Sequence, residues 1–220
     1  SPVTGKRILV GPNTNNLIKK ELFNFIKDFC KDKEISSIHI NFFEENELDF
    51  LKNEGFLIRY GEQFHFINNN YNTFEDYLKK LSYKIRKNIN KERQSIKHQG
   101  IAIEIIKNEE FNESLSQIMY NFYISTIEKK WSYNYLSKDF FIKLPQYLNK
   151  ESILILAKKN KNIVAGALNF ISNNILYGRY WGSNTDIKNL HFEVCYYQAM
   201  ELAIKNKYIK VEAGAQGAHK

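Results

Sequence analysis

The 220-residue sequence has few cysteines and no long apolar run, and each shortage removes a class of protein. Its two cysteines, Cys30 and Cys195, lie far apart without metal-type spacing, so we expect neither a disulfide framework nor a zinc site. No apolar run approaches the roughly 18 residues of a membrane span, and the first residues lack the apolar region of a secretory signal. We therefore expect no membrane span, no metal and a reducing compartment, the cytoplasm.

The charge balance is strongly basic. Lysine and arginine number 32 against 24 acidic residues, which gives a formal net charge of +8. Such an excess favours anionic partners, namely phosphate-bearing cofactors, RNA or an acidic surface. The apolar content of 43% is sufficient for a sizeable core in one or two domains.

The first third of the sequence predicts a helix, a strand, a second helix and a hairpin. Apolar residues at helical spacing predict a helix over 14–32, and a buried strand is expected at 36–43. A short helix over 44–54 should end at Gly55, and 56–67 alternates like two strands joined by a tight turn. The polar stretch 68–72 is a linker, where we place a domain boundary.

A long helix should follow this linker. Thr73 and Asp76 approximate a capping box, and Gly100 should stop the helix. Its cations outnumber its acids, which would attract the phosphates of an anionic donor, although a solvated face explains them equally well. The donor-binding candidates on this helix are Lys84, Arg86, Lys87, Lys91 and Arg93.

The remaining pattern is typical of an α+β layered fold. Three strands in quick succession should form an antiparallel meander after a further strand and two helices, and a helix and a last strand close the chain. The expected elements are a strand at 101–107, helices at 109–130 and 137–148, strands at 152–159, 162–171 and 175–182, a helix at 190–207 and a strand at 208–215.

The stretch 175–198 concentrates aromatic and polar chemistry. Strand alternation places Tyr177, Arg179 and Trp181 on one face and Gly178 on the other. A glycine within such a strand indicates a bulge or a close approach by another backbone or a ligand. The helix that begins near His191 offers unpaired N–H groups to an anion. We expect this stretch to form one wall of a cleft.

Four segments together resemble the FemAB-like branch of the GNAT acyltransferase superfamily, whose members are described as peptidoglycan biosynthesis or recognition proteins. They are SPVTGKRIL at the start, 77–101, 164–183, and 190–204 with EAGAQGAHK at the end. The resemblance implies a GNAT-like fold with a mostly antiparallel sheet flanked by helices, in tandem lobes. Residues 1–70 would be the C-terminal part of an incomplete first lobe and 73–220 the second lobe. Similar proteins run longer at both ends, so the sequence looks like a central piece.

The resemblance also implies an activity, which is transfer of an acyl or aminoacyl group from an activated ester to an amine. The donor would be aminoacyl-tRNA or acyl-CoA, used as a co-substrate without a tightly bound cofactor. The acceptor would be an amine-bearing small molecule or a cell-wall precursor. The glycine-rich Gln/Arg-x-x-Gly-x-Gly/Ala turn of acetyl-CoA-dependent relatives is missing before residue 190, which disfavours acetyl-CoA. A non-catalytic module that binds glycan or nucleic acid, or a structural lobe of a larger assembly, fits the same pattern.

The site residues follow from this interpretation. His191 and Glu193 are the catalytic candidates, although a capping or packing histidine and a glutamate that complements the helix dipole explain them equally well. Cys195 is expected to be a core residue, and Trp131 a packing residue. The residues expected to line the substrate and donor cleft are Tyr177, Gly178, Arg179, Trp181, Tyr197, Glu212, Gln216 and His219.

Overall fold

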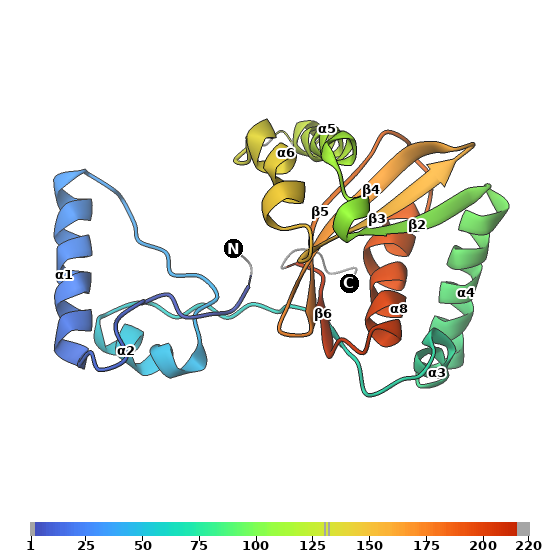
Figure 1. Cartoon of the computed structure of the whole chain (residues 1–220). Coiled ribbons are helices and arrows are strands. Elements are labelled where there is room, and N and C mark those ends of the chain that lie inside the picture. The colour runs from blue at the N-terminus through green and yellow to red at the C-terminus, as the bar shows by residue number, and fades with distance from the viewer. Residues whose placement is uncertain (1–2, 130, 132, 215–220) are drawn as a thin grey trace. The chain divides into compact units, whose positions relative to one another are not determined.

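The computed structural model describes residues 3–129, 131 and 133–214, and the chain divides into two compact units (Figure 1). The first unit ends at Gln63 and the second begins at Phe64. This division falls slightly earlier in the chain than the expected linker. The reason is β1 (His65–Ile67), which pairs with β6 (Lys210–Glu212) and so belongs to the second unit.

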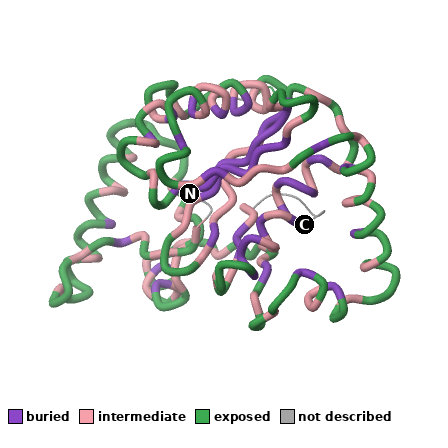
Figure 2. Tube along the Cα trace, turned by 45° about the vertical axis from the view of Figure 1, so that its right-hand side comes forward, coloured by how far each residue is buried: buried purple, intermediate pink, exposed green. Residues whose placement is uncertain are grey.

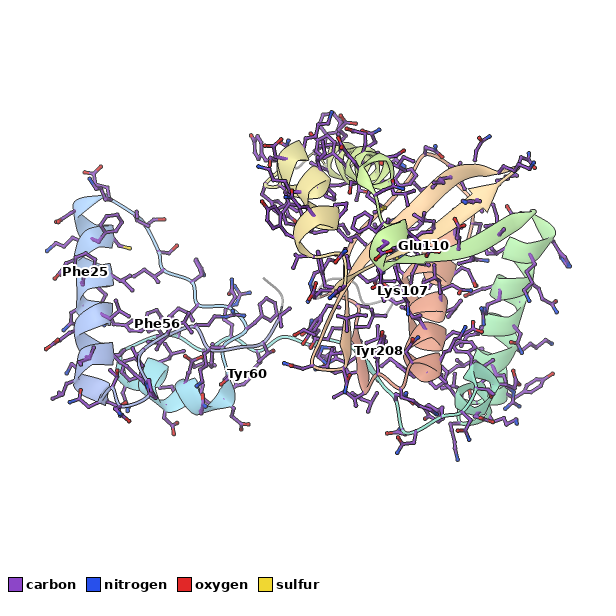
Figure 3. All side chains as sticks on the ribbon, in the orientation of Figure 1. Phe25, Phe56, Tyr60, Lys107, Glu110 and Tyr208 are labelled. Carbon is purple, nitrogen blue, oxygen red and sulfur yellow. The ribbon has the colours of Figure 1, made fainter. Side chains whose placement is uncertain are left out.

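The first unit consists of helices around a small core. Helix α1 (Asn16–Asp32) is capped by the side chain of Asn15, and the 3-10 turn η1 (Glu45–Glu47) leads into α2 (Leu48–Asn53). Ile8, Phe23 and Leu51 are its buried apolar residues, and Phe56, labelled in Figure 3, packs edge-on against Phe23. Both expected helices of this unit are thus confirmed.

The strands expected in the first unit are not formed. Residues 36–43 and 56–62 are irregular, and Tyr60, labelled in Figure 3, is exposed. A strand needs a neighbour for its N–H and C=O groups. The described part of this unit contains no other strand to provide one, so the alternating pattern alone does not produce a sheet.

In the second unit the expected long helix is broken into α3 (Phe74–Lys79) and α4 (Tyr83–His98). The capping box of Thr73 and Asp76 is confirmed, since each side chain bonds the other residue's backbone N–H. The break occurs because Ser82 takes an extended conformation and caps α4, accepting a bond from the N–H of Ile85. Gly100 ends α4 with a φ of +70°, as expected.

A six-stranded sheet forms the centre of the second unit, in the order β1-β6-β5-β4-β3-β2. Adjacent strands are antiparallel except β5 and β6, which are parallel. The expected meander is confirmed, and so is the α+β class with a mostly antiparallel sheet. The strands not yet given are β2 (Ile101–Lys107), β3 (Ser152–Lys159), β4 (Asn162–Ser172) and β5 (Ile175–Ser183).

Helices cover both faces of this sheet (Figures 1 and 2). Ile153 and Ile155 of β3 point into the cluster shared with α4 and α8 (Gln198–Lys205), whereas Leu154 and Leu156 point into the cluster under α5 (Glu113–Lys129) and α6 (Lys138–Tyr147). The 3-10 turn η2 (Asn108–Glu110) connects β2 to α5. The expected helix 190–207 contains three parts, namely α7 (Leu190–Phe192), the π-helical turn η3 (Glu193–Tyr197) and α8. Among the described residues, no helix is long and apolar enough to cross a membrane.

Helix α5 lies directly on β5 at Gly182. A Cβ atom built on Gly182 would lie 2.0 Å from the carbonyl oxygen of Phe122, so only glycine fits. The Thr126 hydroxyl donates a 2.8 Å hydrogen bond to the carbonyl of Trp181 at the same contact. This close approach fixes the helix against the strand that carries the aromatic stretch.

Gly182→Ala should therefore lower the free energy of unfolding by roughly 3 kcal/mol, because the added methyl group forces α5 away from β5. The urea midpoint of the second unit's unfolding measures this. Gly61→Ala is the matched control, since nothing lies within 4 Å of its added Cβ. An unchanged midpoint for Gly182→Ala would show that α5 does not rest on β5 as described.

Candidate active site at the end of the β5 and β6 pairing

In the part of the chain that the structure describes, β5 and β6 pair over three residues, with Ile175–Tyr177 opposite Lys210–Glu212. The next residue of the chain, Ala213, still lies beside Gly178, with its Cα 3.7 Å from a Cβ built there, and β5 continues to Ser183 paired with β4. On the β4 side, Leu168 pairs with Tyr180 but Asn169 pairs with Gly178, which leaves Arg179 as the extra residue of a β-bulge. Of the two alternatives expected at Gly178, the bulge is present, and the backbone of Glu212 and Ala213 also approaches closely.

The bulge changes which side chains share a face. Trp181 packs in the cluster under α8, whereas Tyr180 packs under α5 and α6, 5.5 Å from Tyr123 between ring centroids. The expectation that Trp181 shares a face with Tyr177 and Arg179 is therefore wrong, because the inserted residue shifts the alternation by one position. Burial, assisted by Tyr135 and Tyr123, raises the pKa of Tyr180 to about 12.

Five residues surround the end of the described pairing of β5 and β6, and we call them the fork: Tyr177, Gly178, Arg179, Lys210 and Glu212. Arg179 Nη1 donates a 2.8 Å hydrogen bond to the carbonyl of Gly178, and the guanidinium carbon lies 5.0 Å from the centroid of the Tyr177 ring. Its Nη2 lies 3.9 Å from Glu212 Oε2, which is too long for a hydrogen bond. Burial lowers the pKa of Arg179, and the charge of Glu212 opposes that shift.

Glu212 is the least satisfied group of the fork. The residue is 4% exposed, and Lys210 Nζ lies 2.8 Å from its Oε1. Its Oε2 is buried and has no hydrogen-bond partner among the described residues. A buried carboxylate oxygen without a donor is costly and rare, so this atom is suited to accept a hydrogen from a bound molecule.

Glu193, a predicted catalytic residue, has a different environment although it is equally buried, at 4% exposure. Arg93 donates to it through Nε and Nη2 at 3.1 to 3.2 Å, and Gln198 Nε2 donates at 2.7 Å. Arg93 also bonds Glu201 at 2.7 Å. Burial opposes the charged form of Arg93, but Glu193 and Glu201 outweigh burial and raise its pKa. The two predicted site residues Arg93 and Glu193 thus neutralise each other.

The remaining cleft candidates are divided between other contacts. His191 packs edge-on against Trp181 and Tyr196, with ring centroids 5.2 and 5.4 Å apart. Tyr197 donates to Glu92 of α4, and burial together with this bond raises its pKa well above the usual range. The residues expected to form one wall of a cleft therefore lie in three separate groups, which are the fork, the ring contacts of His191 and the ion pairs of Arg93. Gln216 and His219 lie outside the described residues.

The outer face of α4 is basic, as the sequence predicts. Arg93 does not contribute to this face, because it bonds Glu193 and Glu201. Lys84, Lys87 and Lys91 are exposed, and Arg86 and Lys87 lie about 6 Å from the ring of exposed Tyr83. The only acidic residue of α4 is Glu92, which bonds Tyr197. The exposed face of the helix therefore carries cations without a compensating acid.

The sequence pattern did not single out Lys210. Its position two residues before Glu212 in a strand was the available signal, because such residues share a face. Neither the fork nor any other described part of the chain contains three or more His, Cys, Asp or Glu side chains placed to hold a metal ion.

A hollow of about 460 Å³ lies elsewhere, in the first unit, between the end of α1 and the chain around Phe56. Lys27 lies on its wall and bonds both the carboxylate and the backbone carbonyl of Glu54, at 3.2 and 3.1 Å. These charged groups already bond one another, so we assign the hollow no chemistry.

Comparisons with known proteins show the fold and the family. No protein of curated function matches the sequence significantly. The structure is similar to the crystal structure of FemX, with 13% identity, a TM-score of 0.58 and coverage of 97% of this chain and 71% of that chain. It is also similar to L-PGS from Bacillus licheniformis, with 12% identity, a TM-score of 0.57 and coverage of 79% of this chain.

The aligned region spans about half, 52%, of the L-PGS chain, and likeness at these identities shows the fold. The GNAT-like fold class expected from the sequence is confirmed. A sequence profile of the FemAB-like family, described as peptidoglycan biosynthesis/recognition, matches residues 1–220. Because that match extends over the whole sequence, the chain belongs to the FemAB-like family.

Proposed function

We propose that the protein transfers an aminoacyl or acyl group from an activated ester to an amine. The observation that carries this proposal is the buried Oε2 of Glu212, which has no hydrogen-bond partner among the described residues and lies where the described pairing of β5 and β6 ends, next to the Arg179 bulge. Membership of the FemAB-like family supports the same class of reaction and a peptidoglycan-related acceptor.

The fork has the groups that such a transfer requires. The amine attacks the ester carbonyl, a C–N bond forms and the bond to the donor oxygen or sulfur breaks. The amine loses a proton, and the departing oxygen or sulfur takes one up to leave as an alcohol or thiol. Glu212 Oε2 accepts the hydrogen of the attacking amine. Arg179, with Nη2 3.9 Å away, stabilises the negative charge that develops on the carbonyl oxygen.

We assign the proton transfer to Glu212 and not to Glu193 or His191, the candidates from the sequence, because of the contacts that those two residues make. The Glu193 carboxylate already receives hydrogen bonds from Arg93 and Gln198, so it has little capacity to receive a proton. His191 contacts Trp181, which lies on the other face of β5 from Tyr180. We assign neither of them the proton transfer.

Aminoacyl-tRNA is the donor that we propose, in preference to acyl-CoA. The uncompensated cations on the outer face of α4 suit a long polyanion. The loop before α7 lacks the glycines of an acetyl-CoA anchor. A charged tRNA donor places the reaction in the cytoplasm, and the proposed acceptor is an amine-bearing cell-wall precursor.

Transfer of a labelled aminoacyl group tests the proposal directly. The protein is incubated with charged tRNA or with acyl-CoA in the presence of amine-bearing cell-wall precursors, and labelled amide is counted over several turnovers. We expect product from charged tRNA. Absence of product from both donors, with RNA still bound, would favour a non-catalytic nucleic-acid-binding module, for which the basic face of α4 also suffices.

Glu212→Gln should lower kcat by about 10²-fold, because the amide no longer accepts the proton of the amine. Loss of the charge opposite Lys210 should also lower its free energy of unfolding by about 2 kcal/mol, so kcat is compared on protein whose fold is verified by circular dichroism. Glu193→Gln is the matched control: it weakens the bonds from Arg93 and should lower the free energy of unfolding by about 2 kcal/mol while kcat stays within a few-fold. A large loss of kcat in Glu193→Gln with kcat almost unchanged in Glu212→Gln would instead assign the proton transfer to Glu193.

Replacement of Lys84, Lys87 and Lys91 by Gln should weaken tRNA binding and reduce the slope of log K against log salt by about 2 to 3, because three phosphate contacts are lost. Filter binding across a salt series measures the slope. Lys20, Lys33 and Lys52, exposed residues of the first unit, give a control variant with the same loss of charge. Equal slopes for the two triple variants would mean that net charge, not the α4 face, binds the donor.

A further inference from the structure

The connection between α5 and α6 exposes three large aromatic side chains to solvent. Trp131 is 97% exposed, Tyr133 91% and Tyr135 72%, and we call these three residues the aromatic tip. The sequence suggested that Trp131 packs between helices, and this expectation is wrong. The tip leads from α5 into α6 on the face of the sheet that also carries Tyr180 (Figure 1).

The tip has a fixed base. Tyr123 is buried in α5, and its hydroxyl accepts hydrogen bonds from the backbone N–H groups of Tyr135 and Leu136 at 3.1 and 3.3 Å. The ring of Tyr135 packs edge-on against that of Tyr123, with centroids 5.9 Å apart. The exposed rings of Trp131 and Tyr133 are therefore attached to a segment that is anchored to the core.

The exposure of these rings restricts the kind of partner. A small molecule binds in a concave site that buries most of its surface and supplies a few polar groups. Rings that are more than nine-tenths exposed have no protein walls around them. They suit a partner with an extended surface into which the rings insert, and they do not suit a small ligand that binds in a pocket of the protein.

The net positive charge around the tip indicates an anionic partner. From Glu128 to Lys143 the sequence has four lysines and two acids. Lys143 lies 3.6 Å from Asp139, so these two charges compensate each other, while Lys129, Lys138 and Glu128 are exposed. Trp and Tyr have apolar rings with a polar group, which suits the headgroup level of a bilayer, and lysines beside them attract anionic lipid phosphates.

We propose that the aromatic tip binds the surface of an anionic lipid bilayer, with Trp131 and Tyr133 at headgroup level and the flanking lysines on lipid phosphates. Binding at this level inserts side chains and needs no spanning helix. The proposal does not depend on the transfer reaction, because the tip shares no residue with the fork.

Vesicle binding of the full chain tests the proposal. Trp131 and Trp181 are the only tryptophans, so Trp181→Phe leaves Trp131 as the reporter. With phosphatidylcholine vesicles that contain phosphatidylglycerol, we expect a blue shift of its emission and quenching by a lipid-attached quencher. Vesicles of phosphatidylcholine alone should bind much more weakly, and added salt should reduce binding to the anionic vesicles.

Variants locate the binding. In co-sedimentation, Trp131→Ala with Tyr133→Ala should reduce the partition coefficient on anionic vesicles at least about tenfold, since two anchoring rings are lost. Leu57→Ala with Tyr60→Ala removes two equally exposed apolar side chains from the first unit and should change it less than about twofold. All four side chains are exposed, so both variants should fold, which circular dichroism checks.

Three results would overturn the proposal. The first is no partition onto anionic vesicles. The second is partition that the Trp131 and Tyr133 substitutions leave unchanged, which would assign lipid binding to another basic surface such as α4. The third is binding of soluble glycan fragments or RNA that depends on Trp131 and Tyr133 while vesicles do not bind, which would assign the tip to that partner.

Discussion

The short parallel pairing of β5 and β6 is the constraint on which the rest of the second unit depends. β5 bonds β4 from Ile175 to Ser183, whereas its described pairing with β6 ends at Tyr177. The bulge at Arg179 lies just beyond that end, and its extra residue bends the strand and increases its twist. Gly182 then allows α5 to lie directly on the part of β5 that follows the bulge.

Two buried carboxylates of similar exposure have opposite environments in this unit. Glu193 receives hydrogen bonds from a guanidinium and an amide, so its charge is compensated and its oxygens are occupied. Glu212 shares one oxygen with Lys210 and leaves the other without a donor among the described residues. Burial alone therefore does not identify a reactive group. The number of donors that already reach each oxygen distinguishes a structural ion pair from a group that is available to a substrate.

Local sequence signals predicted local structure well. The helices of the first unit, the capping box at Thr73, the meander and the bulge beside Gly178 all depend on residues close together in the chain. The errors arose where the deciding contact is distant. Residues 36–43 have the pattern of a strand but no neighbouring strand, and Arg93 bonds Glu193, which is 100 residues away. The face of Trp181 was misjudged because a bulge shifts every later position, and a sequence pattern does not show which residue is the inserted one.

Tyr123 connects features that have been described separately. Its hydroxyl holds the backbone where the aromatic tip returns to α6, and its ring lies 5.5 Å from that of Tyr180, the residue next to the bulge. One buried phenol is therefore the support shared by the exposed loop and by the strand beside Glu212. Loss of that phenol would remove a contact from both places at once.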